Sequence, residues 1–186
     1  CRTSCRLTRS ACPTTCGCAT PGSSCAAPAG APEIRQVDAN FEPHVLPVAV
    51  GTRVRWPNLD DIYHNVYSTS DAKPFDLKFY KAEQVPTVTF DVPGRVDVFC
   101  AIHTKMHCIV LVLQNPYFVQ VDANQTYTLR NVPAGTYRLR AWHERLQPAT
   151  AEVVVPETGE VRMDFTLGVT AGRRIRNPNT GISTRA

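Results

Sequence analysis

Hydrophobic and polar positions alternate with a period of two through most of this chain from about Ile34 onward. Such alternation places successive side chains on opposite faces of a β-strand. The alternating runs are short and are separated by Gly, Pro, Asn and Asp, which is typical of an all-β sandwich or barrel. No helical period, heptad or solenoid-type repeat is present. The pattern therefore predicts an all-β protein.

A first group of strands is expected before residue 115. The residues expected to point inward are Thr52, Val54 and Trp56; Ile62, His64 and Val66; Val88 and Phe90; Val96, Val98 and Cys100; and the buried run 109–113. Asn65 falls on the face opposite His64. The stretch 68–84 is less regular and predicts a long loop with a helical turn over 76–81.

A second group of strands begins near Tyr117. The turn signals 122–124 and 132–135 separate its strands. The expected inward positions are Tyr137, Leu139 and Ala141, then Val161, Met163, Phe165 and Leu167. The pattern therefore predicts a second set of strands from about residue 117 to residue 167.

Six of the eight cysteines lie in the first 25 residues, among Ala, Thr, Ser, Pro, Gly and Arg. Such a segment has too few large apolar residues to offset its ordering entropy, so residues 1–32 are predicted to be a disordered leader. A small disulfide knot, a soft-metal tract at Cys16 and Cys18, and a lipid-modified Cys1 are the alternatives. The chain begins at Cys1 rather than Met, so we expect a processed protein or a fragment.

The net charge of +4 comes from the ends of the chain. Residues 1–32 contribute +3 and residues 169–186 contribute +4, which leaves −3 for residues 33–168. The last 18 residues are predicted to be a disordered basic tail. A mildly acidic body gives no basic face for nucleic acid, and no apolar run is long enough for a transmembrane helix.

The most specific chemical signal is Cys100, His103 and Met106 within seven residues. A thiolate, an imidazole and a thioether form a soft ligand set that suits copper. Alternation places Cys100 and His64 on inward strand faces, and His103 and Met106 on the loop that follows. Together these four residues have the composition of a blue-copper site, with two His, one Cys and a weak axial Met.

Other interpretations of the same residues remain open. Cys100 could form a structural disulfide with Cys108, which is common in exported proteins. His64 could be a satisfied core residue, and Met106 could fill the core. Zinc also binds Cys and His, although Met is a poor zinc ligand.

Several motifs together resemble a known family. They are Phe41-Glu42-Pro43, Val48 to Gly51, Trp56-Pro57-Asn58, His64-Asn65-Val66, Val88-Thr89-Phe90, Pro93-Gly94 and Cys100-x-x-His103-x-x-Met106. On these motifs, residues 33–114 resemble a plastocyanin-like cupredoxin domain, a Greek-key β-sandwich or barrel. The compact ligand loop is similar to that of bacterial plastocyanin-like proteins often labelled methylamine utilisation proteins. Residues 115–168, with the motif 141–146, resemble a carboxypeptidase-regulatory-like or transthyretin-like module.

The resemblance implies a function. It implies one type 1 copper that cycles between Cu(I) and Cu(II), with His64, Cys100 and His103 as the trigonal ligands and Met106 as the axial one. Asn65 is expected to support the Cys100 loop by hydrogen bonding, and the loop residue His103 to be the more exposed ligand. A transient redox partner protein and an extracytoplasmic, periplasmic location are also implied.

Two features depart from the family pattern. His107 and Cys108 follow Met106 where small or aromatic residues are usual, and Asn124-Gln125 stands where a turn Gly is common. The alternative functions are copper storage or trafficking, with His107 and Cys108 passing the ion on, and a non-redox module that binds carbohydrate or protein.

No pattern of an enzyme stands out in the sequence. There is no Ser-His-Asp order, Gly-rich phosphate loop or paired-carboxylate site, so we predict that the protein is not an enzyme. His143-Glu144 could bind a second metal, but an isolated pair of this kind is usually solvated, and His44 is also expected at the surface.

Overall fold

The described part of the chain is built from β-strands. A computed structural model describes residues 2–8, 31–168, 174–176 and 183–185, with side chains for 31–168. Every regular element in these ranges is a strand, so the all-β prediction is confirmed. No helix in the same ranges has the length and apolar character needed to cross a membrane.

The chain divides into two compact units. The larger unit is centred on residues 31–116, and the smaller unit contains residues 117–168. The strands of the larger unit are β2 (Arg35–Val37), β3 (Asn40–Glu42), β4 (Val45–Ala49), β5 (Thr52–Arg55), β6 (His64–Ser68), β7 (Phe75–Tyr80), β8 (Thr87–Phe90), β9 (Gly94–Phe99) and β10 (His107–Leu113).

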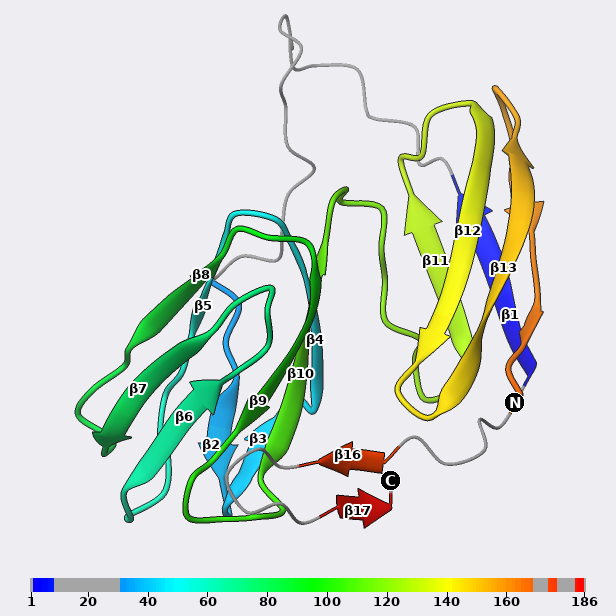
Figure 1. The fold of residues 1–186 in the computed structure, drawn as a ribbon. Helices are drawn as coiled ribbons and strands as arrows, with labels where there is room; N and C mark the ends of the chain where they lie inside the picture. The colour runs from blue at the N-terminus through cyan, green and yellow to red at the C-terminus, as the bar shows by residue number, and fades with distance from the viewer. Residues whose placement is uncertain (1, 9–30, 169–173, 177–182, 186) are drawn as a thin grey trace, which may run out of the picture. The chain divides into compact units, whose positions relative to one another are not determined.

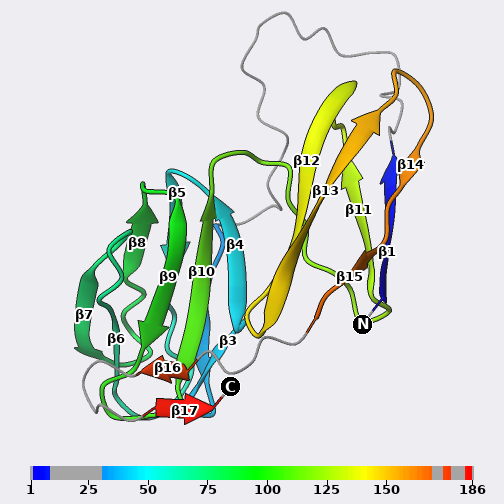
Figure 2. The ribbon, with the colours of Figure 1, turned by 45° about the vertical axis from the view of Figure 1, so that its right-hand side comes forward.

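Five strands of the larger unit form one sheet in the order β4-β10-β9-β6-β7 (Figures 1 and 2). Only β4 and β10 run parallel; the other neighbours are antiparallel. β5 pairs with β8 and β2 pairs with β3, and both pairs are antiparallel. One core joins these sheets, because Val54 of β5, Val66 of β6 and Val110 of β10 are all fully buried in the same cluster. The larger unit is therefore a β-sandwich.

This topology brings the predicted ligands to one end of the sheet. β9 ends at Phe99, directly before Cys100, and its neighbour β6 begins at His64. Because the two strands are antiparallel and Tyr67 pairs with Phe99, the start of β6 extends past the end of β9. The loop between β9 and β10 leaves the sheet at that same end.

Two local predictions were wrong. The expected helical turn over 76–81 is strand β7, in which Phe75 and Leu77 pack against the core while Asp76 lies outward. Pairing with β6 decides the conformation of that segment. Ile62 does not share the inward face of His64 but is 48% exposed, because β6 begins two residues later.

The smaller unit has its own strands and core. Its strands are β1 (Arg2–Thr8), β11 (Thr126–Arg130), β12 (Gly135–His143), β13 (Leu146–Val155), β14 (Val161–Arg162) and β15 (Phe165–Thr166). β12 and β13 form a hairpin, and β11, β14 and β15 pair with β1. Leu129, Val132, Val153 and Val155 are buried together in this unit.

The predicted leader and tail lie mostly outside the described residues. Residues 1, 9–30, 169–173, 177–182 and 186 are not described, so the leader's possible disulfide knot, soft-metal tract and lipid-modified Cys1 stay predictions. In the described part of the leader, β1 runs parallel to β11. In the tail, β16 (Arg174–Arg176) pairs with β17 (Ser183–Arg185).

Candidate metal centre

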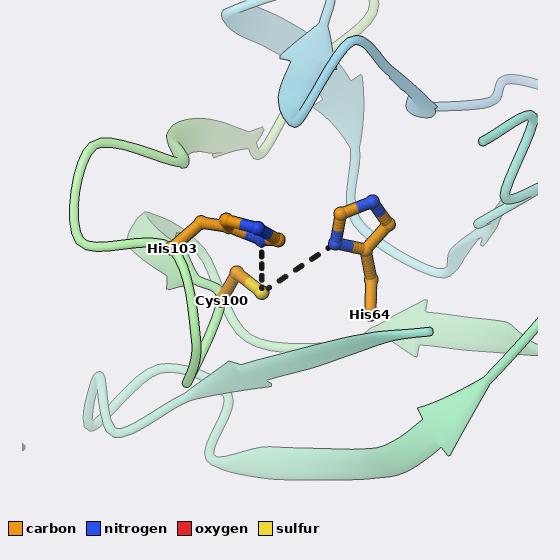
Figure 3. A group of neighbouring side chains, drawn as sticks. All are labelled: His64, Cys100 and His103. Atoms are coloured by element: carbon orange, nitrogen blue, oxygen red, sulfur yellow. Dashed lines mark hydrogen bonds between the residues drawn. The ribbon is translucent and has the colours of Figure 1, made fainter. Parts of the chain in front are cut away.

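Three of the predicted ligands meet at the end of the five-stranded sheet. The Cys100 Sγ lies 3.8 Å from the His64 Nδ1 and 3.7 Å from the His103 Nδ1 (Figure 3). The three donor atoms all lie within 4.8 Å of one another. The thiol thus stands between two imidazole nitrogens, one from strand β6 and one from the loop 100–106.

Two backbone hydrogen bonds fold the ligand loop. The Cys100 N–H donates to the Met106 carbonyl at 3.2 Å, and the Met106 N–H donates to the His103 carbonyl at 3.0 Å. These bonds return the chain to the start of β10 within seven residues and hold Cys100 beside Met106. A short loop closed in this way sets the ligand spacing without help from distant segments.

The four predicted ligands differ in burial. His64 is fully buried, Cys100 and Met106 are each 1% exposed, and His103 is half-buried. Cys100 and Met106 belong to the main core cluster. The rest of the loop around His103 is exposed, including Ile102 at 51%. Only the His103 side of the group therefore reaches the surface.

Residues 30–113 match the family of copper-binding proteins described as the plastocyanin/azurin family. This part of the chain is a plastocyanin/azurin-family cupredoxin domain.

Individual relatives match the same region. Amicyanin-alpha of Methylorubrum extorquens is 29% identical over 89 residues, which cover 46% of this chain and 75% of amicyanin-alpha. A solved structure of a mutant amicyanin in its reduced Cu(I) form has 29% identity and a TM-score of 0.43, and covers 45% of this chain and 83% of that one. A copper-containing nitrite reductase of Thermus scotoductus has 24% identity and a TM-score of 0.44, with 52% of this chain and 25% of that chain covered.

The separations in the cupredoxin domain fit one small metal ion. Histidine nitrogen and thiolate sulfur bind first-row metals such as zinc at about 2.0–2.3 Å, so donors at the corners of a trigonal plane lie roughly 3.5–4 Å apart. The two sulfur–nitrogen separations, 3.8 and 3.7 Å, fall in that range. A thiol, two imidazoles and a nearby buried thioether form a soft donor set, and such a set favours copper.

The outer nitrogen of His64 is held by Asp60. His64 Nε2 lies 2.7 Å from Asp60 Oδ2. An ionised carboxylate only accepts hydrogen bonds, so the Nε2–H of His64 donates, and in the neutral ring Nδ1 then carries the lone pair that faces Cys100. Burial raises the pKa of Asp60, but hydrogen bonds from the Ala39 amide, His64 and the Asp38 amide lower it more, so the net pKa is below the ordinary 3.8.

Asn58 fixes the loop that carries Asp60. The fully buried Asn58 side chain donates to the Ile62 carbonyl at 2.9 Å and to the Tyr80 carbonyl at 3.1 Å. Its Oδ1 accepts a hydrogen bond of 3.0 Å from the Asp60 N–H. Neither Asn58 nor Asp60 was assigned a site role from the sequence, although Asn58 belongs to the family-like Trp56-Pro57-Asn58 motif. The position of Asp60, four residues before His64, was the available signal.

Asn65 lies beside the site but bonds elsewhere. Its side chain is 5% exposed and donates to Asp76 Oδ1 on β7 at 2.7 Å. This bond holds β6 to β7 directly after the predicted ligand His64. The expected hydrogen bond from Asn65 to the Cys100 loop stays a prediction.

Cys108 is not bonded to Cys100. Both thiols are free and buried. Cys108 has no exposed surface, and burial together with the charge of Asp97 raises the pKa of its thiol well above the ordinary value. The neighbouring His107 Nε2 lies 2.9 Å from Asp97 Oδ1. The free Cys100 thiol is thus available to a metal.

The remaining histidines lie at the surface. His44 is exposed, as expected, and its Nδ1 lies 3.1 Å from the His107 carbonyl. In the smaller unit His143 is exposed, and its Nδ1 accepts a hydrogen bond of 3.1 Å from the Arg145 amide. Glu144 is half-buried.

Proposed function

We propose that the cupredoxin domain is a one-electron carrier whose copper is held by His64, Cys100, His103 and Met106. The observation that supports this best is the position of the Cys100 sulfur, at nearly equal distances from two imidazole nitrogens. When bound, copper would supply a Cu(I)/Cu(II) couple, for which this residue set is suited. Cys100, His64 and His103 would provide the three strong ligands, and Met106 the weak axial one.

Rigid ligands favour fast electron transfer because little has to move when the charge changes. His64 is held by β6 and by Asp60, while Cys100 and Met106 are joined through the backbone of the loop 100–106. These three side chains are almost fully buried. The protein would thereby exclude water from the proposed ligands and keep their geometry in both oxidation states of the copper.

His103 is the proposed route for electrons. It is the half-buried member of the group, and its loop neighbours Ile102, Thr104 and Lys105 are exposed. A partner protein in the periplasm would bind briefly over this loop, because a carrier has to dissociate after each transfer. The carrier role proposed here is not enzymatic.

The division of labour along the chain is also a proposal. Residues 33–114 would carry the copper, and residues 115–168, as a carboxypeptidase-regulatory-like module, would bind carbohydrate or another protein. Residues 1–32 and 169–186 would be a leader and a tail.

A copper-trafficking role has less support. It would use His107 and Cys108 to accept the ion, yet Cys108 is fully buried with a raised thiol pKa, and the His107 ring faces Asp97. A thiol binds copper as the thiolate, only after losing its proton, so a buried thiol of high pKa is a poor acceptor of the ion.

Titration of the full chain with Cu(II) tests the proposed function. Intense blue charge-transfer absorption at one copper per cupredoxin domain is expected, with reversible bleaching by a reductant. Cys100→Ala should abolish the colour, whereas Cys108→Ala, which removes a buried thiol eight positions away, should keep it. Colourless binding would favour storage, and no binding by the native chain would refute the proposal. Because the leader adds six cysteines, the colour is compared between the two variants, which share that leader.

A further inference from the structure

The Asp60 carboxylate joins His64 to a turn that lies far from it in the sequence. Asp60 Oδ2 lies 2.7 Å from His64 Nε2 and accepts the Ala39 N–H at 3.0 Å. Its Oδ1 accepts the Asp38 N–H at 2.7 Å. Three donors therefore converge on one carboxylate, whose side chain is only 14% exposed.

The β2–β3 hairpin is shaped to bind this carboxylate. Asp38 and Ala39 form its two-residue loop and have φ angles of 51° and 54°. Consecutive residues in the left-handed region form a type I′ turn, and successive N–H groups that point to the same side make a small anion-binding concavity. Two backbone donors thus face the Asp60 carboxylate.

Strand register places the turn beside Asp60. β2 runs parallel to the segment after β5, with Gln36 opposite Asn58. The Gln36 N–H donates to the Pro57 carbonyl at 3.0 Å, and the Leu59 N–H donates to the Gln36 carbonyl at 2.9 Å. Two residues further along each of these two segments, Asp38 faces Asp60. The contact is therefore part of the fold rather than a chance meeting of surface groups.

We propose that Asp60 is a positioning residue that fixes the Nε2–H tautomer and ring plane of His64, and that its negative charge favours the oxidised state of the bound metal. The first part needs no metal. The second part rests on the proposed function, because it concerns copper. A carboxylate that accepts a hydrogen bond from a ligand imidazole makes that ligand more basic, which stabilises the ion of higher charge. The 38–39 turn holds the carboxylate in place from its other side.

The chain offers a matched control in Asp61. Asp61 is the next residue, carries the same formal charge and is exposed. Asp60→Asn and Asp61→Asn therefore change the net charge equally and close together. Of the two, only Asp60→Asn replaces the charged carboxylate that accepts the His64 hydrogen bond by a neutral amide, in which only one of the two terminal atoms can accept. A difference in behaviour between the two variants therefore reports the hydrogen bond between Asp60 and His64, separately from the general effect of losing one negative charge.

The tautomer is tested without copper. Nitrogen-15 NMR of the native apo chain should show His64 protonated at Nε2, with a slowly exchanging proton, because the ring is fully buried and bonded to Asp60. Protonation at Nδ1 would overturn the inference. In Asp60→Asn this proton should exchange faster, while in Asp61→Asn it should be unchanged. The measurement on the native chain is decisive even if Asp60→Asn does not fold.

The effect on the metal is tested with copper-loaded chains. Asp60→Asn should bind Cu(II) about 10–100-fold more weakly, the range typical of lost outer hydrogen bonds to metal ligands. The Cu(I) affinity should change less, so the reduction potential should rise. The Cu(II) affinity of Asp61→Asn should stay within about twofold of that of the native chain. Equal effects of the two variants would refute the role of Asp60, whereas no copper binding by the native chain would refute the proposed function instead.

Discussion

Gln36 and Tyr80 lie 44 positions apart in the sequence, yet the Gln36 amide donates a 2.6 Å hydrogen bond to the Tyr80 hydroxyl in the core. The Tyr80 hydroxyl in turn donates to the Trp56 carbonyl at 2.8 Å. Tyr80 is also paired with the proposed ligand His64 across β6 and β7. Burial raises the pKa of Tyr80, so its hydroxyl stays protonated and able to donate. This bond therefore ties β2 to the strand beside the metal centre.

Removal of the Tyr80 hydroxyl should destabilise the cupredoxin domain. Tyr80→Phe leaves the buried Trp56 carbonyl without its shorter donor and Gln36 without its shortest acceptor, which costs about 1–3 kcal/mol. Denaturant unfolding of the apo chain measures the loss. Tyr63→Phe is the control, because Tyr63 is 55% exposed. Equal stability of both variants would contradict the role given to this bond.

Replacement of Met106 should tune the metal centre without emptying it. Met106→Leu keeps the buried volume but removes the weak axial sulfur, so blue copper should be retained with a higher reduction potential. A rise on the order of 59 mV corresponds to a tenfold change in the equilibrium constant of a one-electron reduction. Redox titration measures the potential. Met163→Leu, the same change at the chain's other methionine, should leave the potential unaltered. Loss of all colour in Met106→Leu would contradict a purely axial role.

The stability of the apo chain should fall in acid through Asp97. Burial raises the pKa of Asp97, but hydrogen bonds from His107 and Arg95 and the charge of Arg95 lower it more, to below 3.8. A carboxyl whose folded pKa is depressed binds protons more readily when unfolded. Its stabilisation is therefore complete above about pH 4 and is lost as the pH falls through the folded pKa.

Substitution of Asp97 separates its contribution from those of other carboxyls. Asp97→Asn should lower the free energy of unfolding at pH 7 by about 1.5–3 kcal/mol, since hydrogen bonds to a charged group are lost. It should also make the free energy of unfolding fall less steeply below pH 4, and Asp60 should account for part of the fall that remains. Unfolding curves at several pH values measure both effects. Asp91 is exposed, so Asp91→Asn should change neither the free energy of unfolding at pH 7 nor its decline in acid. An unaltered pH dependence of stability in Asp97→Asn would exclude Asp97 as a source of acid sensitivity.

A glycine at position 125 should stabilise the smaller unit. Gln125 has a φ angle of 62°, and its N–H donates to the Asp122 carbonyl at 3.0 Å. The left-handed conformation costs a residue with a side chain about 1–2 kcal/mol, so Gln125→Gly should gain roughly 0.5–1 kcal/mol after the entropy of glycine is counted. Calorimetry of the unfolding transition measures it. Asn124→Gly, one residue earlier and not in a positive-φ conformation, should be neutral or destabilising.

Local patterns in the sequence were sufficient for much of the candidate metal centre. The ligand loop is short, so the spacing of Cys100, His103 and Met106 already brings these residues close together. The inward positions of Val96, Val98 and Cys100 follow from alternation and are confirmed by their burial. The turn at Gln125, where the family-like pattern favours glycine, is likewise a local feature that the structure reports as a positive φ.

Alternation failed where neighbouring strands decide the conformation. Ile62 continues the phase of His64 and Val66, but Asn58 holds residues 58–62 as a loop, so Ile62 lies outside the strand. The segment Phe75–Tyr80 is β7 because it pairs with β6 at the edge of the five-stranded sheet. Asn65, expected on the face opposite His64, is buried as well, since all five residues of β6 are covered. These outcomes depend on pairing partners far away in the sequence.

The sequence by itself determined the all-β class, the identity of the soft donors and the compact loop, because these depend on residue types and on spacings of a few positions. Only the tertiary structure decided which nitrogen of His64 faces Cys100. That choice depends on Asp60, which is held by amides of the turn at Asp38 and Ala39. A hydrogen bond between segments about twenty residues apart exists only when strand register aligns them, and no local pattern encodes that register.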